Sequence, residues 1–371
     1  MSEDLYLSQK QVIYDLIRYF DMFAGIGGFR AGFDRAGGYQ CVGHCEIDKY
    51  ADAGYRAIHD IRKEECFYPY ARDIDPAALP DFDLLCGGFP CQSFSLAGKR
   101  EGFKDPRGTL FFEISRLAEA RRPPYLLLEN VPGLLSHDKG QTFAAILRTL
   151  SDLGYGVEWM VCNSADHGVP QARKRVFIVG YLNPRCTGKI LPVPASTGKA
   201  PVQVLGGRLG KRVYSAEGSA VTQLAKTDGR GNGLYFVNPS KGADVLYIKE
   251  ATKRGFAEAV PGDAVSFAYS GSNTRRGRVG RGFAHTLTTD CTQGVVTACG
   301  RIRRLTPREC LRLQGFHDDQ IDRLLSVTSN AQAYKQAGNS VTVNVIEAIG
   351  RNLRVMDAEL KALDGKAGDA P

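Results

Sequence analysis

Cys91 is the residue of this 371-residue sequence best suited to covalent chemistry. It stands between Pro90 and Gln92, directly after the largely apolar run Asp83–Phe89. A thiolate at the end of a strand can act as a nucleophile, because covalent catalysis divides one difficult step into easier ones. Cysteine is also among the residues most often buried for packing alone, so a structural role stays open on this position alone.

Ionisable side chains accompany two further apolar runs. Glu129 closes the run that begins at Tyr125, and a carboxylate at the end of a buried strand is costly unless solvent or a partner meets it. Arg173 and Arg175 lead into Val176–Gly180. Because strand side chains alternate, both guanidinium groups are predicted to lie on one face, although a solvated strand entry is the alternative for this pair.

A glycine-rich turn joins the first apolar run to a helical pattern. Residues 23–28 read Phe-Ala-Gly-Ile-Gly-Gly, and glycine lets the backbone approach a nucleotide closely. Glu46 follows Gly28 by 18 residues, at the end of the next apolar run, where it can accept hydrogen bonds from a ribose. The G-x-G-G spacing differs from that of pyrophosphate binders, and no P-loop lysine follows. The turn therefore favours a nucleoside without phosphates, such as S-adenosylmethionine, over NAD or ATP, with a ligand-free tight turn as the alternative.

The elements that must position these residues alternate between short apolar runs and helical periodicity, which is typical of βαβ units around a parallel sheet. The predicted strands are Tyr19–Phe23, Gln40–Glu46, Leu84–Cys86, Tyr125–Glu129, Gly156–Asn163 and Arg175–Tyr181. The predicted helices are Ile26–Ala36, Lys49–His59, Leu110–Arg121 and Gln141–Leu153. We predict a doubly wound α/β fold with a mostly parallel sheet. Ligands of such sheets lie beyond the carboxyl ends of the strands, so Cys91 is expected beside the cofactor.

A second module is predicted where the composition changes. From Asn183 to about Arg208 the chain is rich in Pro, Gly, Ser and Thr, and short strand-like runs follow between Gly-rich turns. Residues 186–310 carry 19 Lys and Arg against 8 Asp and Glu, although the whole chain is only +8. This basic region is typical of a polyanion-binding surface, with a solvated face as the alternative.

Helical patterns return at Pro307–Gln314 and Val341–Leu353. The predicted domains are therefore a catalytic domain, residues 1–185 plus 306–371, and an irregular, β-rich domain, residues 186–305.

The ten cysteines include no C-x-x-C pair, and Cys41 and Cys45 have no second ligand pair at metal spacing. We expect reduced cysteines and no metal. The N-terminus is polar and acidic, and no apolar stretch reaches the length of a membrane span. The expected location is the cytosol, without membrane association.

Taken in order, the motifs resemble those of the bacterial and phage DNA (cytosine-5)-methyltransferases. The resemblance spans about residues 19–350. It rests on Phe23–Gly28, Cys45–Asp48, Gly88–Gln92, Arg107–Leu110, Glu129–Val131, Gln171-x-Arg173-x-Arg175, Arg304–Glu309 and Gly338–Val341.

This resemblance implies a mechanism. Cys91 would attack C6 of cytosine, which makes C5 nucleophilic enough to accept a methyl group from S-adenosylmethionine. Glu129 would hold or deliver a proton at N3, Arg173 would favour the thiolate, and Arg175 would contact the base carbonyl or the adduct. The implied cofactor residues are Phe23, Ala24, Gly25, Ile26, Gly28, Glu46, Ile47, Asp73, Ile74, Pro90, Leu110, Asn339, Ser340 and Val341.

The resemblance also implies double-stranded DNA as the partner and a flipped-out cytosine, because the chemistry is sterically impossible inside a duplex. The residues expected to contact DNA are Gln92, Ser95, Arg275, Arg276, Arg278 and Thr286, and the basic module is the expected target-recognition domain. We expect a monomer that can be paired in function with a restriction endonuclease.

Three alternatives remain at this level. A branch of the same family methylates tRNA with a similar core, and the sizeable basic module argues for DNA. A catalytically silent DNA-binding module would leave the complete set of catalytic residues unexplained. A nicotinamide oxidoreductase would rest on the glycine turn alone.

Overall fold

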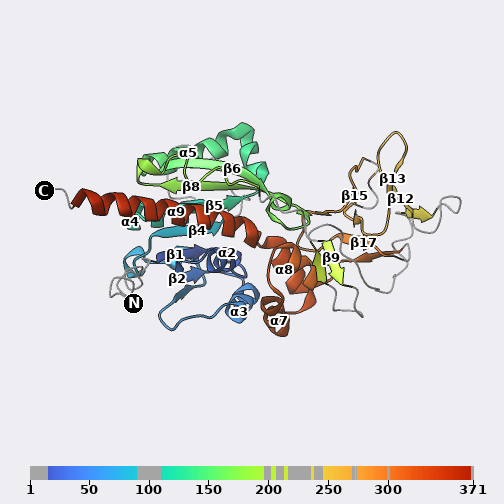
Figure 1. Cartoon of the computed structure of the whole chain (residues 1–371), viewed down its shortest axis with the longest axis horizontal. Helices are drawn as coiled ribbons and strands as arrows, with labels where there is room; N and C mark the ends of the chain where they lie inside the picture. Colours follow the sequence, from blue (N-terminus) through green and yellow to red (C-terminus); the bar gives the residue numbers. More distant parts are fainter. Residues whose placement is uncertain are drawn as a thin grey trace, which may run out of the picture.

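The computed structural model describes residues 16–89, 110–195 and 245–368, apart from 270, 271, 273, 299 and 300, together with the backbone of three short strands between residues 202 and 237. A seven-stranded sheet with the order β3-β2-β1-β4-β5-β8-β6 forms its centre (Figure 1). The strands are β1 Ile17–Met22, β2 Tyr39–Cys45, β3 Cys66–Tyr68, β4 Leu84–Gly88, β5 Tyr125–Asn130, β6 Gly156–Asn163 and β8 Lys174–Tyr181.

The first five of these strands in spatial order run parallel, and β8 is antiparallel to both β5 and β6. The predicted mostly parallel α/β fold is thus confirmed, with a reversed strand near one edge. Because β8 runs the opposite way, its amino end meets the carboxyl ends of β4 and β5. That reversal brings Arg173 and Arg175 to the same edge as Glu129.

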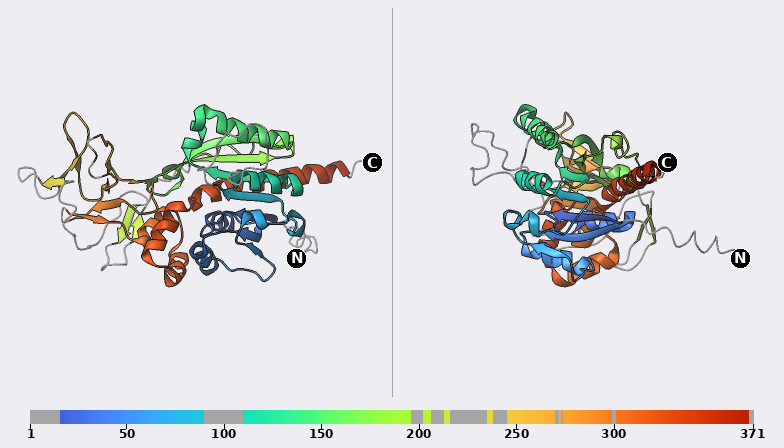
Figure 2. Two further views of the ribbon diagram at one scale, coloured as in Figure 1. Left: turned by 180° about the vertical axis from the view of Figure 1, so that it is seen from behind. Right: turned by 90° about the vertical axis from the view of Figure 1, so that its left-hand side faces the viewer.

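Helices cover both faces of the sheet, giving three layers (Figure 2). One face packs on α2 (Gly28–Ala36) and α9 (Val343–Gly368) through a core that includes Tyr19, Phe33 and Leu127. The other face packs on α4 (Leu110–Arg121) and α5 (Gln141–Asp152). Strand residues alternate between the two cores, because successive side chains of a strand point to opposite faces.

Local signals explain where the remaining helices begin. Asp48 caps α3 (Lys49–Ile58) by accepting a hydrogen bond from the Tyr50 backbone. Thr306 and Glu309 form a reciprocal capping box at the start of α6 (Pro307–Leu313). Two further helices, which the sequence analysis does not predict, are α7 (Asp318–Val327) and α8 (Asn330–Asn339). The last helix is longer than its predicted span, Val341–Leu353.

The second module consists of small sheets, most of which lie at the end of the molecule opposite the C-terminus (Figure 1). A three-stranded sheet contains β11 Tyr235–Val237, β12 Leu246–Lys249 and β13 Phe256–Ala259, and β9 Val202–Leu205 pairs with β10 Val213–Ser215. A four-stranded sheet contains β14 Ala264–Ser266, β15 Val279–Gly280, β17 Gln293–Val296 and β18 Ile302–Arg304.

One short ladder ties this module to the body of the molecule. Strand β16 (Ala284–His285) pairs in parallel with β7 (Gln171–Ala172), immediately before β8. At the predicted domain boundary, Cys186, Ile190 and Val193 are buried in the core beneath α9. We therefore propose that the second module starts after Val193 rather than at residue 186. Among the described residues, no helix is both long and apolar enough to cross a membrane.

Candidate active site

A pocket of about 860 Å³ opens at the carboxyl ends of β1, β2, β4 and β5. The strand order reverses between β1 and β4 at this edge, where open α/β sheets bind their ligands. Segments far apart in the sequence line it. They are Phe23–Ile26, Gly28–Phe29, Cys45–Asp48, Pro69–Arg72, Gly88–Phe89, Leu110, Glu129–Val131, Arg173, Arg175, Lys335–Gln336 and Gly338–Val341, together with Ala51.

The glycine turn after β1 needs backbone conformations that other residues rarely adopt. Gly25 and Gly27 have φ of 58° and 80°, and Phe23 has φ of 57°. A Cβ on Gly28 would lie 2.6 Å from Val341 Cγ1, so the turn and the segment before α9 touch with no room for a side chain. The predicted glycines therefore serve both close approach and close packing.

Glu46 holds this turn from the end of β2. Its Oε2 accepts a hydrogen bond from the Gly25 backbone at 2.7 Å, and its Oε1 accepts one from the Asp48 backbone at 2.7 Å. Burial raises the pKa of Glu46, while these backbone hydrogen bonds lower it. Each carboxylate oxygen can accept a second hydrogen bond, which leaves capacity for the hydroxyls of a ribose. Ile47, also lining the pocket, is 70% exposed and offers an apolar surface to a ring.

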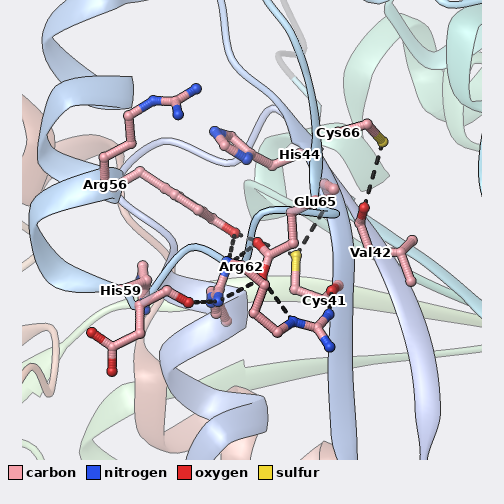
Figure 3. A network of polar contacts seen from close by, with 12 residues as sticks. Cys41, Val42, His44, Arg56, His59, Arg62, Glu65 and Cys66 are labelled. Carbon is pink, nitrogen blue, oxygen red and sulfur yellow. Dashed lines mark hydrogen bonds and ion pairs between the residues drawn. The ribbon is translucent and has the colours of Figure 1, made fainter.

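A network of polar contacts joins β2, α3 and the segment that follows α3, and His59 connects it to the glycine turn (Figure 3). Arg30 forms an ion pair with Glu65 at 2.6 Å, and Arg62 donates to both Glu65 and the Cys41 carbonyl. His59 contacts the Ile26 carbonyl at 3.2 Å and lies where a Cβ on Gly27 would be. The conformation of the turn therefore depends on contacts with β2, α2 and α3.

Asp21 is a buried carboxyl in β1, two residues before the turn begins at Phe23. It is fully inaccessible, its Oδ1 lies 3.8 Å from Cys86 Sγ, and its Oδ2 has no hydrogen-bond partner among the described residues. Burial raises its pKa to about 8, opposed by the charge of Arg30. Asp21 does not line the pocket.

Helix α8 closes the opposite wall of the pocket. Lys335 Nζ forms an ion pair with Asp48 Oδ2 at 2.6 Å, and Gln336 donates to the Tyr50 carbonyl at 2.7 Å. Both contacts fasten α8 to the start of α3, and they bring Asn339, Ser340 and Val341 to the pocket as predicted. Lys335 and Gln336 themselves were not predicted. Their place in the run that precedes Gly338-Asn339-Ser340 was the available signal.

Glu129 and Arg175 meet at the end of β5. Arg175 Nε lies 2.8 Å from Glu129 Oε1, and each side chain is 14% exposed. Burial raises the pKa of Glu129, with Arg175 and then Arg173 opposing that shift. Next to them, the buried Asn130 side chain donates to the Phe89 carbonyl at 2.8 Å. This bond fixes the end of β4 against the end of β5.

Arg173 is almost completely buried, at 1% exposure, yet it also lines the pocket. Its guanidinium donates to the carbonyls of Gly338, Ser340 and Leu287 at 2.9, 2.8 and 3.3 Å. Burial lowers the pKa of Arg173, and the neighbouring Arg175 adds to the effect. The side chain thereby joins the wall of the pocket to the second module.

Several predicted site residues fall elsewhere. Pro90, Cys91, Gln92 and Ser95 lie outside the described residues, and Phe89, the last described residue before them, lines the pocket. The predicted pair Asp73–Ile74 does not line the pocket. Asp73 is exposed at the end of a 3-10 turn, Ala71–Asp73, and Ile74 is buried in the core, whereas Ala71 and Arg72 reach the pocket.

The residues expected to contact DNA divide into two groups. Arg276 is exposed and Arg275 is half-buried, so both remain candidates. Arg278 differs from them, because its side chain is 1% exposed and its guanidinium donates to the carbonyls of Ser266, Ala268 and Tyr269. Thr286, partly exposed, donates to the Ala172 carbonyl at 2.9 Å.

Within the described ranges, no three His, Cys, Asp or Glu side chains gather in a way that could hold a metal ion.

Comparison with known proteins matches this chain over most of its length. A family model described as C-5 cytosine-specific DNA methylase matches residues 17–354. The type II methyltransferase M.NlaX of Neisseria lactamica is 35% identical over 348 residues, covering 91% of this chain and 96% of the relative. The type II methyltransferase M.HpaII of Haemophilus parainfluenzae is 36% identical, covering 90% of this chain and 88% of the relative.

A solved structure of DNMT2 from Spodoptera frugiperda aligns with a TM-score of 0.55 at 17% identity, covering 92% of this chain and 99% of that one. At this identity the likeness concerns the fold.

Proposed function

This chain belongs to the C-5 cytosine-specific DNA methylase family and is a DNA (cytosine-5)-methyltransferase, and from that premise we propose that it uses S-adenosylmethionine and a covalent bond between Cys91 and C6 of the target cytosine. One observation carries the proposal. The Glu129–Arg175 pair, the end of β4 that leads to Cys91, and the glycine turn with Glu46 all face one pocket.

The pocket residues fit S-adenosylmethionine. The spare acceptor capacity of Glu46 suits the ribose hydroxyls, Phe23 and Ile47 suit the faces of the adenine, and the turn from Ala24 through Gly28 leaves backbone room for the methionine portion. The proposed remainder of the site is Pro90, Leu110, Asn339, Ser340 and Val341, and Ala71 and Arg72 take the place in the wall that the sequence analysis assigns to Asp73–Ile74. Bound there, S-adenosylmethionine would supply an electrophilic methyl group on a sulfonium, and the electrons of the broken carbon–sulfur bond would stay on its sulfur, leaving S-adenosylhomocysteine as the product.

In the proposed first step, the Cys91 thiolate attacks C6 and forms a carbon–sulfur bond. The electron pair of the C5–C6 double bond becomes available at C5, which bonds to the methyl group. Glu129, whose pKa burial raises, holds or delivers a proton at N3 and so offsets the charge that the attack places on the ring. Arg175 donates to the base carbonyl from the position that its ion pair with Glu129 fixes.

In the second step, a water molecule removes the C5 proton. The electrons of that bond restore the double bond, and the sulfur of Cys91 leaves C6. Asn130 orients the loop throughout, since its side chain holds the Phe89 carbonyl two residues before Cys91. Arg173, which the sequence analysis assigns to thiolate activation, donates to three carbonyls and is proposed to act mainly on the positions of its neighbours.

The proposed substrate is a cytosine flipped out of a specific duplex sequence. We propose that Gln92 and Ser95 close over the flipped base and that Arg275, Arg276 and Thr286 contribute to the DNA surface of the second module. We further propose a monomeric enzyme of the cytosol that can be paired with a restriction endonuclease.

A duplex in which 5-fluorocytosine replaces the target base tests the covalent step. Fluorine at C5 leaves no proton to remove after methyl transfer, so the sulfur cannot depart. With S-adenosylmethionine present, we expect a protein–DNA product that survives denaturing electrophoresis. Its absence under conditions of confirmed binding would contradict the covalent mechanism.

The matched variant is Cys91→Ser, which is expected to lose turnover and the trapped product while DNA binding largely survives. Methyl transfer to tRNA, measured in parallel, checks the substrate class. Activity confined to tRNA would reject the DNA assignment.

A further inference from the structure

Arg278 organises the loop between β14 and β15 from the inside. Its two terminal nitrogens donate to the carbonyls of Ser266, Ala268 and Tyr269 at 3.3, 2.9 and 2.7 Å. Its own backbone is held in turn, because Glu250 Oε1 accepts from the Arg278 N–H at 2.5 Å. Burying a guanidinium is costly, and three carbonyl acceptors together with a nearby carboxylate compensate for that cost. The backbone positions of Ser266, Ala268 and Tyr269 are therefore strongly determined.

This anchoring holds Tyr269 in an unfavourable state. Its φ is 52°, in the left-handed region that an aromatic residue rarely adopts, and its side chain is 77% exposed. A left-handed conformation costs a non-glycine residue about 1–3 kcal/mol and persists only where the surroundings impose it. The protein thus keeps a large aromatic ring in solvent on a strained backbone, where Gly or Asn would be easier to accommodate.

Arg275 lies beside this ring. Its guanidinium carbon is 6.0 Å from the centre of the Tyr269 ring. Its Nε is buried, and nothing in the described part of the chain accepts a hydrogen bond from it. The neighbouring arginines differ, since Arg276 Nε donates to the Ala251 carbonyl and Arg278 is fully engaged. Arg275 as a whole is only half-buried, and no described carboxylate forms an ion pair with it, so its charge is available to an anionic partner.

The same loop is connected to the active site. His285 Nε2 lies 3.1 Å from the Arg278 carbonyl, and His285 belongs to β16, which pairs with β7. Two residues further on, the Leu287 carbonyl accepts from the buried Arg173 of the pocket wall. The Tyr269 backbone is thus linked to the wall of the catalytic pocket through Arg278, His285 and Leu287.

We propose that Tyr269 and Arg275 form a DNA-reading pair, in which the Arg275 guanidinium binds a backbone phosphate and the Tyr269 ring packs against a base of the recognition sequence. This inference rests on the proposed function, because it takes duplex DNA as the ligand. Arg278, which the sequence analysis assigns to DNA contact, instead becomes the positioning residue of the pair. Phosphate contacts set the register of a protein on DNA, and base contacts supply the sequence preference.

The first part of the test determines the recognition sequence. The full chain is expressed in a host that lacks its own cytosine methylation, and bisulfite sequencing of the host DNA gives the methylated motif. Tyr269→Asn, Arg275→Ala and Val260→Ala are analysed in the same way. Asn tolerates the left-handed conformation, so Tyr269→Asn removes the ring without adding strain. Val260, 45% exposed in the same module, serves as the control.

The second part measures binding to a duplex with the motif and to single-mismatch duplexes over a series of salt concentrations. For Tyr269→Asn we expect discrimination at one position to fall about tenfold, consistent with the 1–3 kcal/mol of a good base contact, with an unchanged or higher Tm. For Arg275→Ala we expect all duplexes to bind more weakly. The slope of log K against log salt should decrease in magnitude by about 0.9, as one lost phosphate contact requires.

Two results would overturn the proposal that Tyr269 and Arg275 read DNA. One is a Tyr269→Asn protein with the wild-type motif and the wild-type discrimination. The other is an Arg275→Ala protein with an unchanged salt slope. Equal losses in Val260→Ala would also count against it, because the effect would then belong to the module at large. A wild-type chain that binds the duplexes but leaves host DNA without 5-methylcytosine would instead contradict the proposed function.

Discussion

Glu129 combines a buried carboxyl with two neighbouring cations, and its protonation should control the rate. Burial raises its pKa, so the protonated form that can donate to N3 is more populated at neutral pH than for an exposed carboxyl. As pH rises through this pKa, the donor is lost and kcat should fall. Glu129→Gln cannot transfer a proton, and we expect a loss of 10²–10⁴-fold with a flatter alkaline side of the pH profile.

Single-turnover rates over a pH series check this expectation. Glu119→Gln, on the exposed face of α4, is the matched control and should follow the wild type. A Glu129→Gln protein with wild-type kcat and pH dependence would remove Glu129 from the proton step.

Asp21 should make stability depend on pH in the opposite sense from an ordinary paired carboxylate. Its pKa is raised from 3.8 to about 8 by burial, so the folded state binds more protons than the unfolded state between these values. Stability is then greatest below about pH 4 as far as this group is concerned, and it decreases as pH rises towards 8. Asp21→Asn should weaken that decrease. Chemical denaturation of both proteins at pH 5, 7 and 9 gives the free energy of unfolding at each pH. The same change with pH in the two proteins would contradict this role of Asp21.

At the scale of elements, the contact between the start of α2 and the segment before α9 has no spare volume. An added Cβ on Gly28 would lie 2.6 Å from Val341 Cγ1 and 3.0 Å from the Val341 carbonyl. We expect Gly28→Ala to separate these two walls of the pocket, at a cost of about 1–3 kcal/mol of stability and about tenfold in affinity for S-adenosylmethionine.

Isothermal titration with S-adenosylmethionine and urea denaturation give the two quantities. Gly133→Ala is a suitable control, because its nearest neighbour, Val131 Cγ2, would be 4.0 Å away. Unchanged affinity in Gly28→Ala would mean that the close approach is not needed for binding.

Six of the seven strands of the sheet could be predicted from the sequence to within two residues, because their apolar runs stand out from the helical patterns around them. Strand β3, Cys66–Tyr68, was missed, because three residues are too few to show a periodicity. The direction of β8 could not be predicted, since periodicity reports which face a side chain occupies and not which way its strand runs. Helices α7 and α8 were missed because charged and polar residues dominate them and only a few positions are buried.

The pocket residues were predictable for a different reason. Glycines, a carboxylate and arginines at the ends of strands predict a ligand site by their residue types alone, without knowledge of how the elements pack. Arg278 shows the limit of this approach. An arginine in a Gly-rich basic segment has the composition of a DNA contact, and only the fold reveals that its donors are turned inward.

At the scale of the whole molecule, Arg173 is the joint between the pocket and the recognition module. Its guanidinium donates to three carbonyls from two segments, Gly338 and Ser340 beside the pocket and Leu287 in the recognition module. Lysine keeps the charge but cannot reproduce this planar set of bonds. We expect Arg173→Lys to lose about 3 kcal/mol of stability, at roughly 1 kcal/mol for each hydrogen bond, and to weaken binding of both DNA and S-adenosylmethionine.

The rate at which iodoacetamide alkylates Cys91 over a pH series separates this role from thiolate activation. If Arg173 acts by its charge, Arg173→Lys should keep the wild-type thiol pKa and the wild-type ligand affinities. If it acts as a joint, the affinities should fall even where the thiol pKa does not move.

The packing of α9 against α2 has a consequence for how the enzyme is made. The pocket draws one wall from residues 23–28 and another from residues 338–341, so the ribosome must translate the recognition module before the second wall exists. Domains generally fold in the order of synthesis, but the catalytic domain cannot complete its core and its pocket until α9 has been translated. A nascent or prematurely terminated chain therefore lacks a complete donor site. We expect methyl transfer to begin only after residues 338–341 have been translated and have reached the glycine turn.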